Sequence, residues 1–427
     1  MDKRMRSSKR KIAIVNVFFP PQAVGGATRV VADEVSVLQS KYNDQFDFVV
    51  FSTDAFRQPA HLMHVYPYNG TRVYSPSSLW RHNMDWYAID EQMGKLFDDF
   101  LTFEKPDAVH FHCLQRLTAS IVDVTRKRNI PYFVTAHDAW WISDYQFLTD
   151  TSGRVYVDGH PDPFSDIPLL PGITRDQSLD RRRYLNSLLK DAVSVLCVSD
   201  AYTELYKKNG VTNCVTNKNG ISNFVNWSPK DTTYTRRVVC AHIGGMAKHK
   251  GYHLFKQAME QSRLTNIELL VVDDSKPEAF SDKTSWADTP VTIVGRVAQE
   301  RVVELYQRID VLFAPSICPE SFGLVTREAV ACGCWVVGSD VGAIGEDIVS
   351  SNGFRVTPTV DNLRSVISEI DRNPTKYKQH SHSPKVRFSS DQVSELVELF
   401  SAALADREQT DIERRSVSIR EPSTTFN

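Results

Sequence analysis

Short apolar runs alternate with amphipathic stretches along most of this chain. In the first half, runs rich in Val, Ile and Phe occur at residues 11–19, 107–112, 132–138 and 194–199. Such near-continuous runs predict strands that are buried on both faces, as in parallel sheets covered by helices. Stretches with helical spacing of their apolar residues, at 28–41, 114–128 and 200–210, predict the covering helices.

The second half repeats this order. Apolar runs lie at residues 238–245, 267–274, 291–297, 311–315 and 335–340, and amphipathic stretches lie at 250–262, 298–308 and 324–333. The repetition predicts an α/β fold made of two doubly wound, Rossmann-like parallel-sheet domains in tandem. Ligands are expected at the carboxyl ends of the strands.

The predicted domain boundaries follow changes in composition. We expect a disordered basic arm at 1–10, an N-terminal domain at 11–220, a C-terminal domain at 221–400 and a disordered polar tail at 401–427. The polar, turn-rich passage 219–235 separates the two halves. Residues 148–175, with Gly, Pro and Asp throughout, predict a long loop in the first domain, and loops of this length are usually functional or mobile.

Composition narrows the class of protein. A chain of 427 residues exceeds the ~250–300 residues at which one core stops growing, which agrees with two domains. The net charge of −2 argues against a nucleic-acid partner. Seven dispersed cysteines indicate buried, reduced thiols and therefore a cytoplasmic protein. No apolar run reaches the ~18–20 residues that span a bilayer, so the basic arm is either a solvated tail or a weak peripheral contact with anionic lipid at the inner face of the membrane.

Residues 319–348 carry the most chemical information. An apolar run ends at 315, a turn follows, and a helix begins near Leu324, where the first amide groups favour a phosphate. Glu320 and Glu328 flank this turn. Because carboxylates repel a phosphate but accept strong hydrogen bonds from hydroxyl groups, the combination suits a diphosphate between hydroxyl-rich groups, as in a nucleotide sugar. On spacing alone, an acidic helix start and an exposed surface glutamate explain the pattern equally well.

This stretch resembles the E-x7-E motif of the retaining family 4 glycosyltransferases of GT-B fold, in which two Rossmann-like domains face each other across a cleft. The small-residue strand at 331–340 and the Gly-rich loop ending in an acid at 341–347 also follow that family. The resemblance implies that Glu320 contacts the hydroxyls of the donor sugar and Glu328 those of the ribose. The donor-binding residues between them would be Ser321, Phe322, Gly323 and Leu324.

The segment HIGGMAKHKGYHLF at 242–255 resembles the strand, loop and helix that bring a basic pair to the diphosphate in that family. Lys250 matches the family's lysine and would supply positive charge in place of a metal. The family's arginine falls on Gly245, so it is absent here. Lys248 or His249 would have to compensate for it.

Two further segments resemble parts of the donor site. PPQAVGGATRVVADEV at 20–35 is similar to the N-terminal glycine loop, with Gly25 and Gly26, although a plain turn explains this glycine pair equally well. The turn Gly295–Arg296–Val297 matches the segment that lies against the nucleotide base. The adjacent aspartates at 273–274 lack the spacing of a metal-binding DxD motif, and a turn or capping role is expected for them.

TAHDAWW at 135–141 resembles the family's His-Asp segment, whose histidine reaches the donor sugar, and that role falls on His137. The nearby His110 and His112, at the end of a preceding strand, favour a functional site over a lone structural histidine. Trp140 and Trp141 would either bind the face of an acceptor sugar or cap the core.

The predicted function is retaining, metal-independent transfer of a sugar from a nucleotide-diphosphate sugar to a hydroxyl group of a glycan or lipid-linked acceptor. Glu320, His137 and Lys250 would be the catalytic residues, and the nucleotide sugar would be a co-substrate, with no cofactor. Family analogy suggests a role in polysaccharide or lipid-linked glycan biosynthesis. The alternatives are a nucleotide-sugar epimerase, a non-catalytic partner subunit of the same fold and a basic-armed membrane adaptor.

Overall fold

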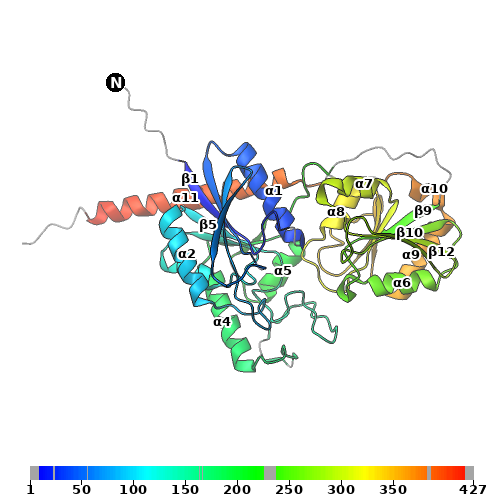
Figure 1. Ribbon diagram of the computed structural model, residues 1–427, viewed down its shortest axis with the longest axis horizontal. Coiled ribbons are helices and arrows are strands. Elements are labelled where there is room, and N and C mark those ends of the chain that lie inside the picture. The colour runs from blue at the N-terminus through cyan, green and yellow to red at the C-terminus, as the bar shows by residue number, and fades with distance from the viewer. Residues whose placement is uncertain are drawn as a thin grey trace, which may run out of the picture. The chain divides into compact units, whose positions relative to one another are not determined.

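The computed structural model describes residues 9–418 apart from 23–24, 55, 163, 166, 226–236 and 382–385 (Figure 1). Most of the predicted basic arm, part of the predicted junction and the end of the predicted tail lie outside the described residues. The chain divides into two compact units. The first comprises the described residues up to 135, 184–196 and those from 390 onward, and the second comprises 136–183 and 197–389.

The first sheet has eight strands. In spatial order they are β3 (Met63–Tyr68), β4 (Thr71–Pro76), β2 (Phe46–Phe51), β1 (Arg10–Val15), β5 (Ala108–Phe111), β6 (Tyr132–Ala136), β7 (Ser194–Cys197) and β8 (Cys214–Thr216). β1 pairs in parallel with β2 and β5, whereas β3 and β4 form an antiparallel hairpin at one edge. The helices of this half are α1 (Gly25–Lys41), α2 (Glu91–Glu104), α3 (Ser120–Lys127), α4 (Arg175–Asp191) and α5 (Asp200–Lys208).

The C-terminal helix α11 (Ser389–Ser418) packs against the core of the first unit. Its apolar side chains recur at helical spacing and join the cluster around β1, β2 and α1; they are Val393, Leu396, Val397, Phe400 and Leu404. The predicted boundary at 400 is therefore wrong, since this segment returns to the first unit. The predicted disorder is also wrong over 401–418, which is helical.

The second sheet has seven strands. Their spatial order is β11 (Ser281–Trp286), β12 (Thr289–Val294), β10 (Ile267–Val272), β9 (Val238–His242), β13 (Val311–Ala314), β14 (Trp335–Ser339) and β15 (Gly353–Val356). All pairs are parallel except β11 with β12. The helices are η1 (Lys248–Lys250), α6 (Tyr252–Glu260), η2 (Gln299–Arg301), α7 (Val302–Gln307), α8 (Leu324–Ala331), α9 (Val360–Arg372) and α10 (Pro374–Lys378).

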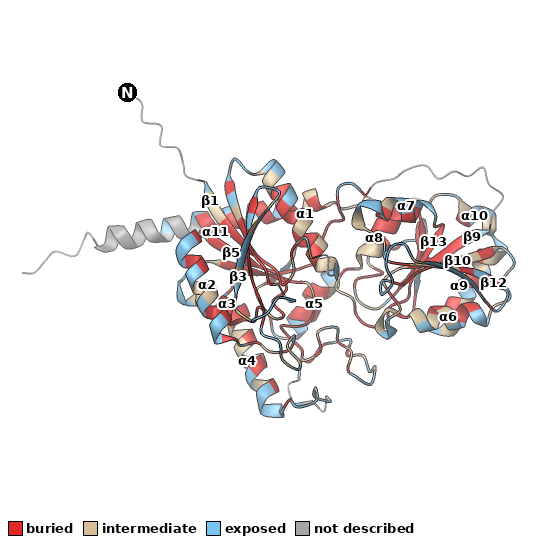
Figure 2. Cartoon of the chain, viewed as in Figure 1, coloured by how far each residue is buried: buried red, intermediate tan, exposed pale blue. Residues whose placement is uncertain are grey.

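Both faces of the second sheet are buried, as the apolar runs predict. Along β9, Val238 and Cys240 belong to one core cluster, whereas Val239 and Ala241 belong to another, because successive side chains of a strand point to opposite faces. Figure 2 shows the central strands largely buried. The predicted α/β class with two doubly wound, mainly parallel sheets is confirmed.

The connection at 148–175 contains turns and one isolated bridge, between Thr149 and Val155, but no named helix or strand before α4 begins at Arg175, as far as its described residues show. A long loop is what its composition predicts. Among the described residues, no helix has the length and apolar character needed to cross a bilayer.

Candidate functional site

Glu320 lies in the turn between β13 and α8, at the carboxyl edge of the second sheet. Its backbone forms a bridge with Gly342, and its carbonyl oxygen accepts a hydrogen bond from Ala343 N at 2.9 Å. Gly342 has a φ of 68°, and a Cβ atom there would lie 2.6 Å from Glu320 N. A glycine is therefore required in the 341–347 loop to hold the Glu320 backbone in place.

The structure brings the two predicted residues Lys250 and Glu320 into contact. Lys250 Nζ lies 3.0 Å from Glu320 Oε2, and the Ser316 hydroxyl donates a hydrogen bond to Glu320 Oε1. The Lys250 side chain is 32% exposed and that of Glu320 14% exposed. This ion pair is thus within reach of a ligand.

A second glycine allows the loop that carries Lys250 to approach the end of β13. Gly251 has a φ of 72°, and a Cβ atom on it would lie 1.9 Å from Pro315 O. The carbonyl oxygen of His249 accepts a hydrogen bond from Ile317 N at 2.9 Å. Backbone contact between η1 and the segment after β13 therefore fixes Lys250 beside Glu320.

The ion pair shifts both pKa values in the direction that keeps the groups charged. Burial raises the pKa of Glu320, but the Lys250 charge and the hydrogen bonds from Ser316 and Lys250 outweigh it, so the net pKa is lowered. Burial lowers the pKa of Lys250, but the carboxylate of Glu320 outweighs it, and the net pKa is raised. At neutral pH the site holds one carboxylate and one ammonium.

The N-terminus of α8 begins beside this pair. Gly323 caps the helix with a φ of 85°. The buried Arg327 guanidinium donates to Phe322 O and, at 2.8 Å, to Ala343 O, and it lies 4.1 Å from the centre of the Phe322 ring. Arg327 therefore holds the carbonyl groups of the turn. Thr326 N donates to Gly323 O at 3.3 Å, whereas the two amides that precede it in α8, those of Leu324 and Val325, come before the first hydrogen bonds of an α-helix. Sequence reasoning did not identify Arg327 or Ser316.

Glu328, which follows on α8, is 1% exposed. Its carboxylate accepts hydrogen bonds from Tyr306 Oη at 3.0 Å and from Gln299 Nε2 at 3.2 Å. The alternative that Glu328 is an exposed surface residue is therefore wrong. Gln299 also connects Glu328 to the segment that follows the predicted base-contacting turn 295–297.

Gly245, where the resembled family has an arginine, lies beside the carboxylate of Asp274. Gly245 has a φ of 79°, and a Cβ atom there would lie 2.7 Å from the Asp274 carboxylate. An arginine at 245 would be strained and would displace Asp274. The neighbouring Asp273 accepts hydrogen bonds from the amide and hydroxyl of Ser275, at 3.1 and 2.6 Å, which confirms the predicted turn role for that aspartate.

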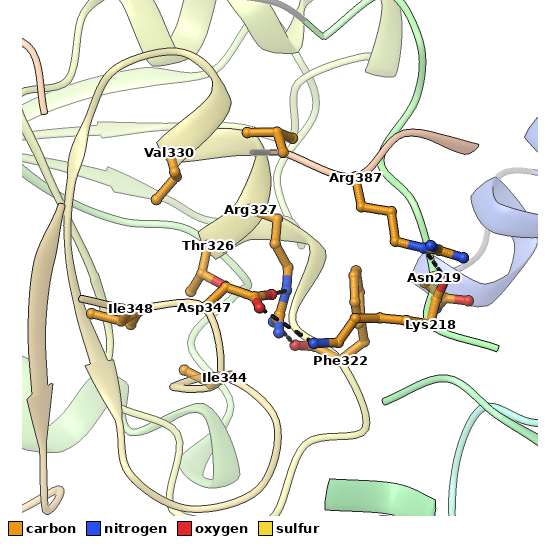
Figure 3. A pocket seen from close by; sticks show the side chains of 11 residues that line it. Lys218, Asn219, Phe322, Thr326, Arg327, Val330, Ile344, Asp347, Ile348 and Arg387 are labelled. Atoms are coloured by element: carbon orange, nitrogen blue, oxygen red, sulfur yellow. Dashed lines mark hydrogen bonds and ion pairs between the residues drawn. The ribbon is translucent and has the colours of Figure 1, made fainter. Parts of the chain in front are cut away.

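A pocket of about 240 Å³ is lined in part by side chains of α8 (Figure 3). It is lined by Lys218, Asn219, Phe322, Thr326, Arg327, Val330, Ile344, Asp347, Ile348, Val386 and Arg387. Asp347 lies between Arg327 and Lys218, at 2.8 and 3.3 Å. Asp347 thus pairs with two of the three cations that line the pocket, Lys218 and Arg327 but not Arg387, and neither Glu320 nor Lys250 lines it.

The remaining predicted residues lie in several places. Gly25 begins α1 with a φ of 74° and no atom within 4 Å of a built Cβ, and Gly26 follows it. A Cβ on Gly295 would lie 1.8 Å from Pro277 O; Arg296 is exposed and Val297 packs against the β9 core.

Ser321 and Leu324 are half-buried in the α8 turn, and His137 follows β6 directly and is half-buried. Their contacts with a donor stay predictions.

Burial settles the open alternative about Trp140 and Trp141. Trp140 and Trp141 are 2% and 4% exposed, and Arg181 donates to Trp140 O at 2.9 Å. They cap the core and do not present a face to an acceptor. His110 and His112 are each 1% exposed, so they do not line an open site.

A carboxylate, an ammonium and a helix N-terminus at the carboxyl edge of an α/β sheet define a class of site that suits an anion bearing hydroxyl groups. The family comparisons agree with this class. Residues 24–222 match the family described as "Glycosyltransferase Family 4", and residues 224–383 match "Glycosyl transferases group 1". With both halves matched, the chain belongs to the glycosyltransferases of GT-B fold.

Known proteins resemble the chain in part. The D-inositol 3-phosphate glycosyltransferase of Mycobacteroides abscessus is 31% identical over 28% of this chain and 28% of its own length. The lipopolysaccharide 1,2-N-acetylglucosaminetransferase of Salmonella typhimurium is 25% identical over 35% of this chain and 42% of its own length. The matched stretches thus span less than half of these relatives.

Solved structures confirm the two-domain fold. Sucrose-phosphate synthase from Thermosynechococcus elongatus superimposes with a TM-score of 0.64 over 96% of this chain and all of its own, at 17% identity. HepE of Anabaena, in complex with UDP and glucose, gives a TM-score of 0.62 over 92% of this chain and 99% of its own, at 16% identity. At these identities the likeness establishes the fold alone.

Proposed function

We propose that this protein transfers a glycosyl group from a nucleotide-diphosphate sugar to a hydroxyl acceptor, with retention of the anomeric configuration. The observation that carries the proposal is the contact between Lys250 and Glu320 at the N-terminus of α8. A diphosphate would take the ammonium and the helix amides, and the released carboxylate would accept hydrogen bonds from the sugar hydroxyls.

In this scheme Lys250 and the first amides of α8 stabilise the charge that develops on the leaving diphosphate, without a catalytic metal. Positioned charges and dipoles of this kind often provide the largest part of a rate enhancement, because they need no rearrangement during the reaction. Glu320 orients the sugar, and His137 acts on the donor sugar. The ribose contact that the family resemblance gives to Glu328 requires this buried carboxylate to exchange its hydrogen bond with Tyr306 or Gln299 for one from a ribose hydroxyl. Retention and the role of His137 follow from the family resemblance.

The relatives support a nucleotide-sugar donor. HepE was crystallised with UDP-glucose, and the catalytic domain of starch synthase IV from Arabidopsis thaliana with ADP and acarbose. The curated relatives act on D-inositol 3-phosphate and lipopolysaccharide, so we propose a glycan or lipid-linked hydroxyl as acceptor.

A screen of UDP-, GDP- and ADP-sugars by thermal unfolding tests the donor site, because a ligand that binds the folded state raises apparent stability. We expect at least one donor to raise the unfolding midpoint of the wild type, and Lys250→Ala to remove most of that shift. Lys256→Ala is the control, since Lys256 is a lysine on α6 whose side chain is 43% exposed and pairs with Glu260. No shift with any donor would refute the proposal.

A second candidate is a non-catalytic donor-binding subunit. The observation that favours it is the Asp274 carboxylate beside Gly245, where the family places a cation. Radiolabelled donor incubated with mixed glycan acceptors, and with water alone, separates the two. Donor binding with neither transfer nor hydrolysis would support the second candidate.

A further inference from the structure

A closed cluster of one carboxylate and two imidazoles lies in the first unit, outside the residues assigned to transfer. Glu34 is on α1, and His110 and His112 are at the end of β5; each is 1% exposed. His110 Nδ1 lies 3.0 Å and His112 Nε2 3.6 Å from Glu34 Oε1. The ligand atoms of all three lie within 4.8 Å of one another.

The two-residue period of an extended strand and the spacing of buried residues on helix α1 bring these groups together. His110 and His112 are two residues apart on extended backbone, so both point to the same face of the sheet. Glu34 is on the buried stripe of α1 that otherwise consists mainly of apolar residues, namely Val30, Val31, Val35 and Leu38. A carboxylate on such a stripe is costly unless a cation compensates it.

The carboxylate is incompletely satisfied by the protein. Glu34 Oε2 is buried and has no hydrogen-bond partner, and the two imidazoles are the only basic groups paired with Glu34 among the described residues. Buried oxygens of this kind are rare and indicate a missing partner such as an ion.

We propose that Glu34, His110 and His112 bind a divalent transition-metal ion, with Zn²⁺ the best match. At ~2.0–2.1 Å from each ligand, tetrahedral geometry places ligand atoms about 3.3 Å apart, and the observed separations of 3.0 and 3.6 Å bracket that distance. Two imidazoles and one carboxylate are a common ligand set for such ions.

The surroundings suit this assignment. His110 Nε2 lies 2.7 Å from Thr135 Oγ1, so in the metal-bound form its N–H donates to the hydroxyl and Nδ1 is left to face the ion. The ion would tie α1 to β5. It would be structural, and it would fix the helix whose first residue is Gly25.

The metal content of the full chain tests the proposal. The chain is produced without a histidine tag in medium supplemented with Zn²⁺ or Co²⁺, because a site this closed is loaded during folding, and is then washed with chelator. We expect about one ion per chain, with visible absorption of four-coordinate Co²⁺ in which a water molecule is the fourth ligand. The ion should fall below about a tenth per chain in Glu34→Gln and His112→Gln, and stay in the exposed-histidine control His64→Gln.

Two outcomes would overturn the proposal. One is a wild-type chain that carries no ion after folding in either metal, which would leave a buried hydrogen-bonded triad. The other is unchanged metal content in Glu34→Gln. If the variants do not accumulate as folded protein, the stoichiometry and Co²⁺ spectrum of the wild type decide the question.

Discussion

Two of the clusters in which a glutamate contacts basic side chains, one around Glu34 and one around Glu320, differ in their access to solvent. In the first unit, Glu34 and its two histidines are each 1% exposed. In the second unit, the side chains of Glu320 and Lys250 are 14% and 32% exposed. The closed cluster cannot exchange its partners for a solute without opening the fold, whereas the open pair can. The first is therefore suited to holding structure and the second to binding a ligand.

Removing the acid of the closed cluster should give the largest loss of stability. Glu34→Ala leaves two buried imidazoles without their carboxylate, and breaking such a buried interaction typically costs about 3 kcal/mol or more. Chemical denaturation of the purified chain measures the change. The control Glu204→Ala removes a surface carboxylate paired with Lys207 and should cost less than about 0.5 kcal/mol. Equal losses in both variants would contradict the distinction.

Removing Lys250 from its pair with Glu320 should lower activity strongly and stability only slightly, which is the opposite of the effect at Glu34. Lys250→Ala is expected to lower the transfer rate by at least ~100-fold, because the leaving diphosphate loses its ammonium, while the free energy of unfolding changes by less than about 1 kcal/mol. Initial rates with the donor found by thermal screening measure the effect. Lys256→Ala should retain nearly full activity. A stability loss as large as that of Glu34→Ala would show that Lys250 is structural.

The backbone that delivers Lys250 can be tested separately. Gly251→Ala forces a Cβ atom against Pro315 O at a positive φ, and we expect a loss of about 2 kcal/mol, together with weaker donor binding. The matched control is Gly70→Ala, where φ is 84° but no atom lies within 4 Å of the built Cβ. Only the conformational cost of about 1 kcal/mol should remain there. Equal losses of stability in the two variants would mean that the contact between Gly251 and Pro315 O adds no strain of its own.

The repeated pattern of apolar runs was sufficient to predict the two mainly parallel sheets, because interior strands are apolar on both faces. Edge strands do not show this signal. In β11, residues 281–285 are exposed, and β3 is mostly half-buried or exposed, so neither has a continuous apolar run. The return of α11 to the first unit was missed because its apolar residues, between Val393 and Leu404, are followed by a charged segment that reads as a solvated tail.

The candidate site was predicted where family motifs cover it, and missed where side chains converge from elsewhere. Glu320 and Lys250 are 70 positions apart, and only the motif resemblance pairs them before the structure does. Ser316 and Arg327, which hold the carboxylate and the turn, are ordinary residues in the sequence. Their roles depend on a backbone geometry that Gly342 and Gly251 permit, and no local pattern specifies that geometry.

The smallest expected effect is the acid dependence of the open pair. The pKa of Glu320 is lowered in the folded chain from its usual value of 4.5, because the Lys250 charge and the Ser316 hydroxyl outweigh burial. The stability it contributes is therefore fully present above pH 4.5 and is lost as the pH falls below that value. Since the pair is partly exposed, the loss should be about 1 kcal/mol or less.

Denaturation curves of the wild type and Glu320→Gln between pH 6 and pH 3 measure this difference. The free energy of unfolding of the wild type should exceed that of the variant above pH 4.5 and lose this excess only below pH 4.5. The excess should also be smaller in 0.5 M NaCl, because salt screens partly exposed charges. A diphosphate donor present at saturation should remove the pH dependence of this pair, since Lys250 would then be paired with phosphate. An acid-induced loss that persists unchanged with bound donor would mean that Lys250 does not exchange partners, and the contrast between the open and the closed cluster would fail at that point.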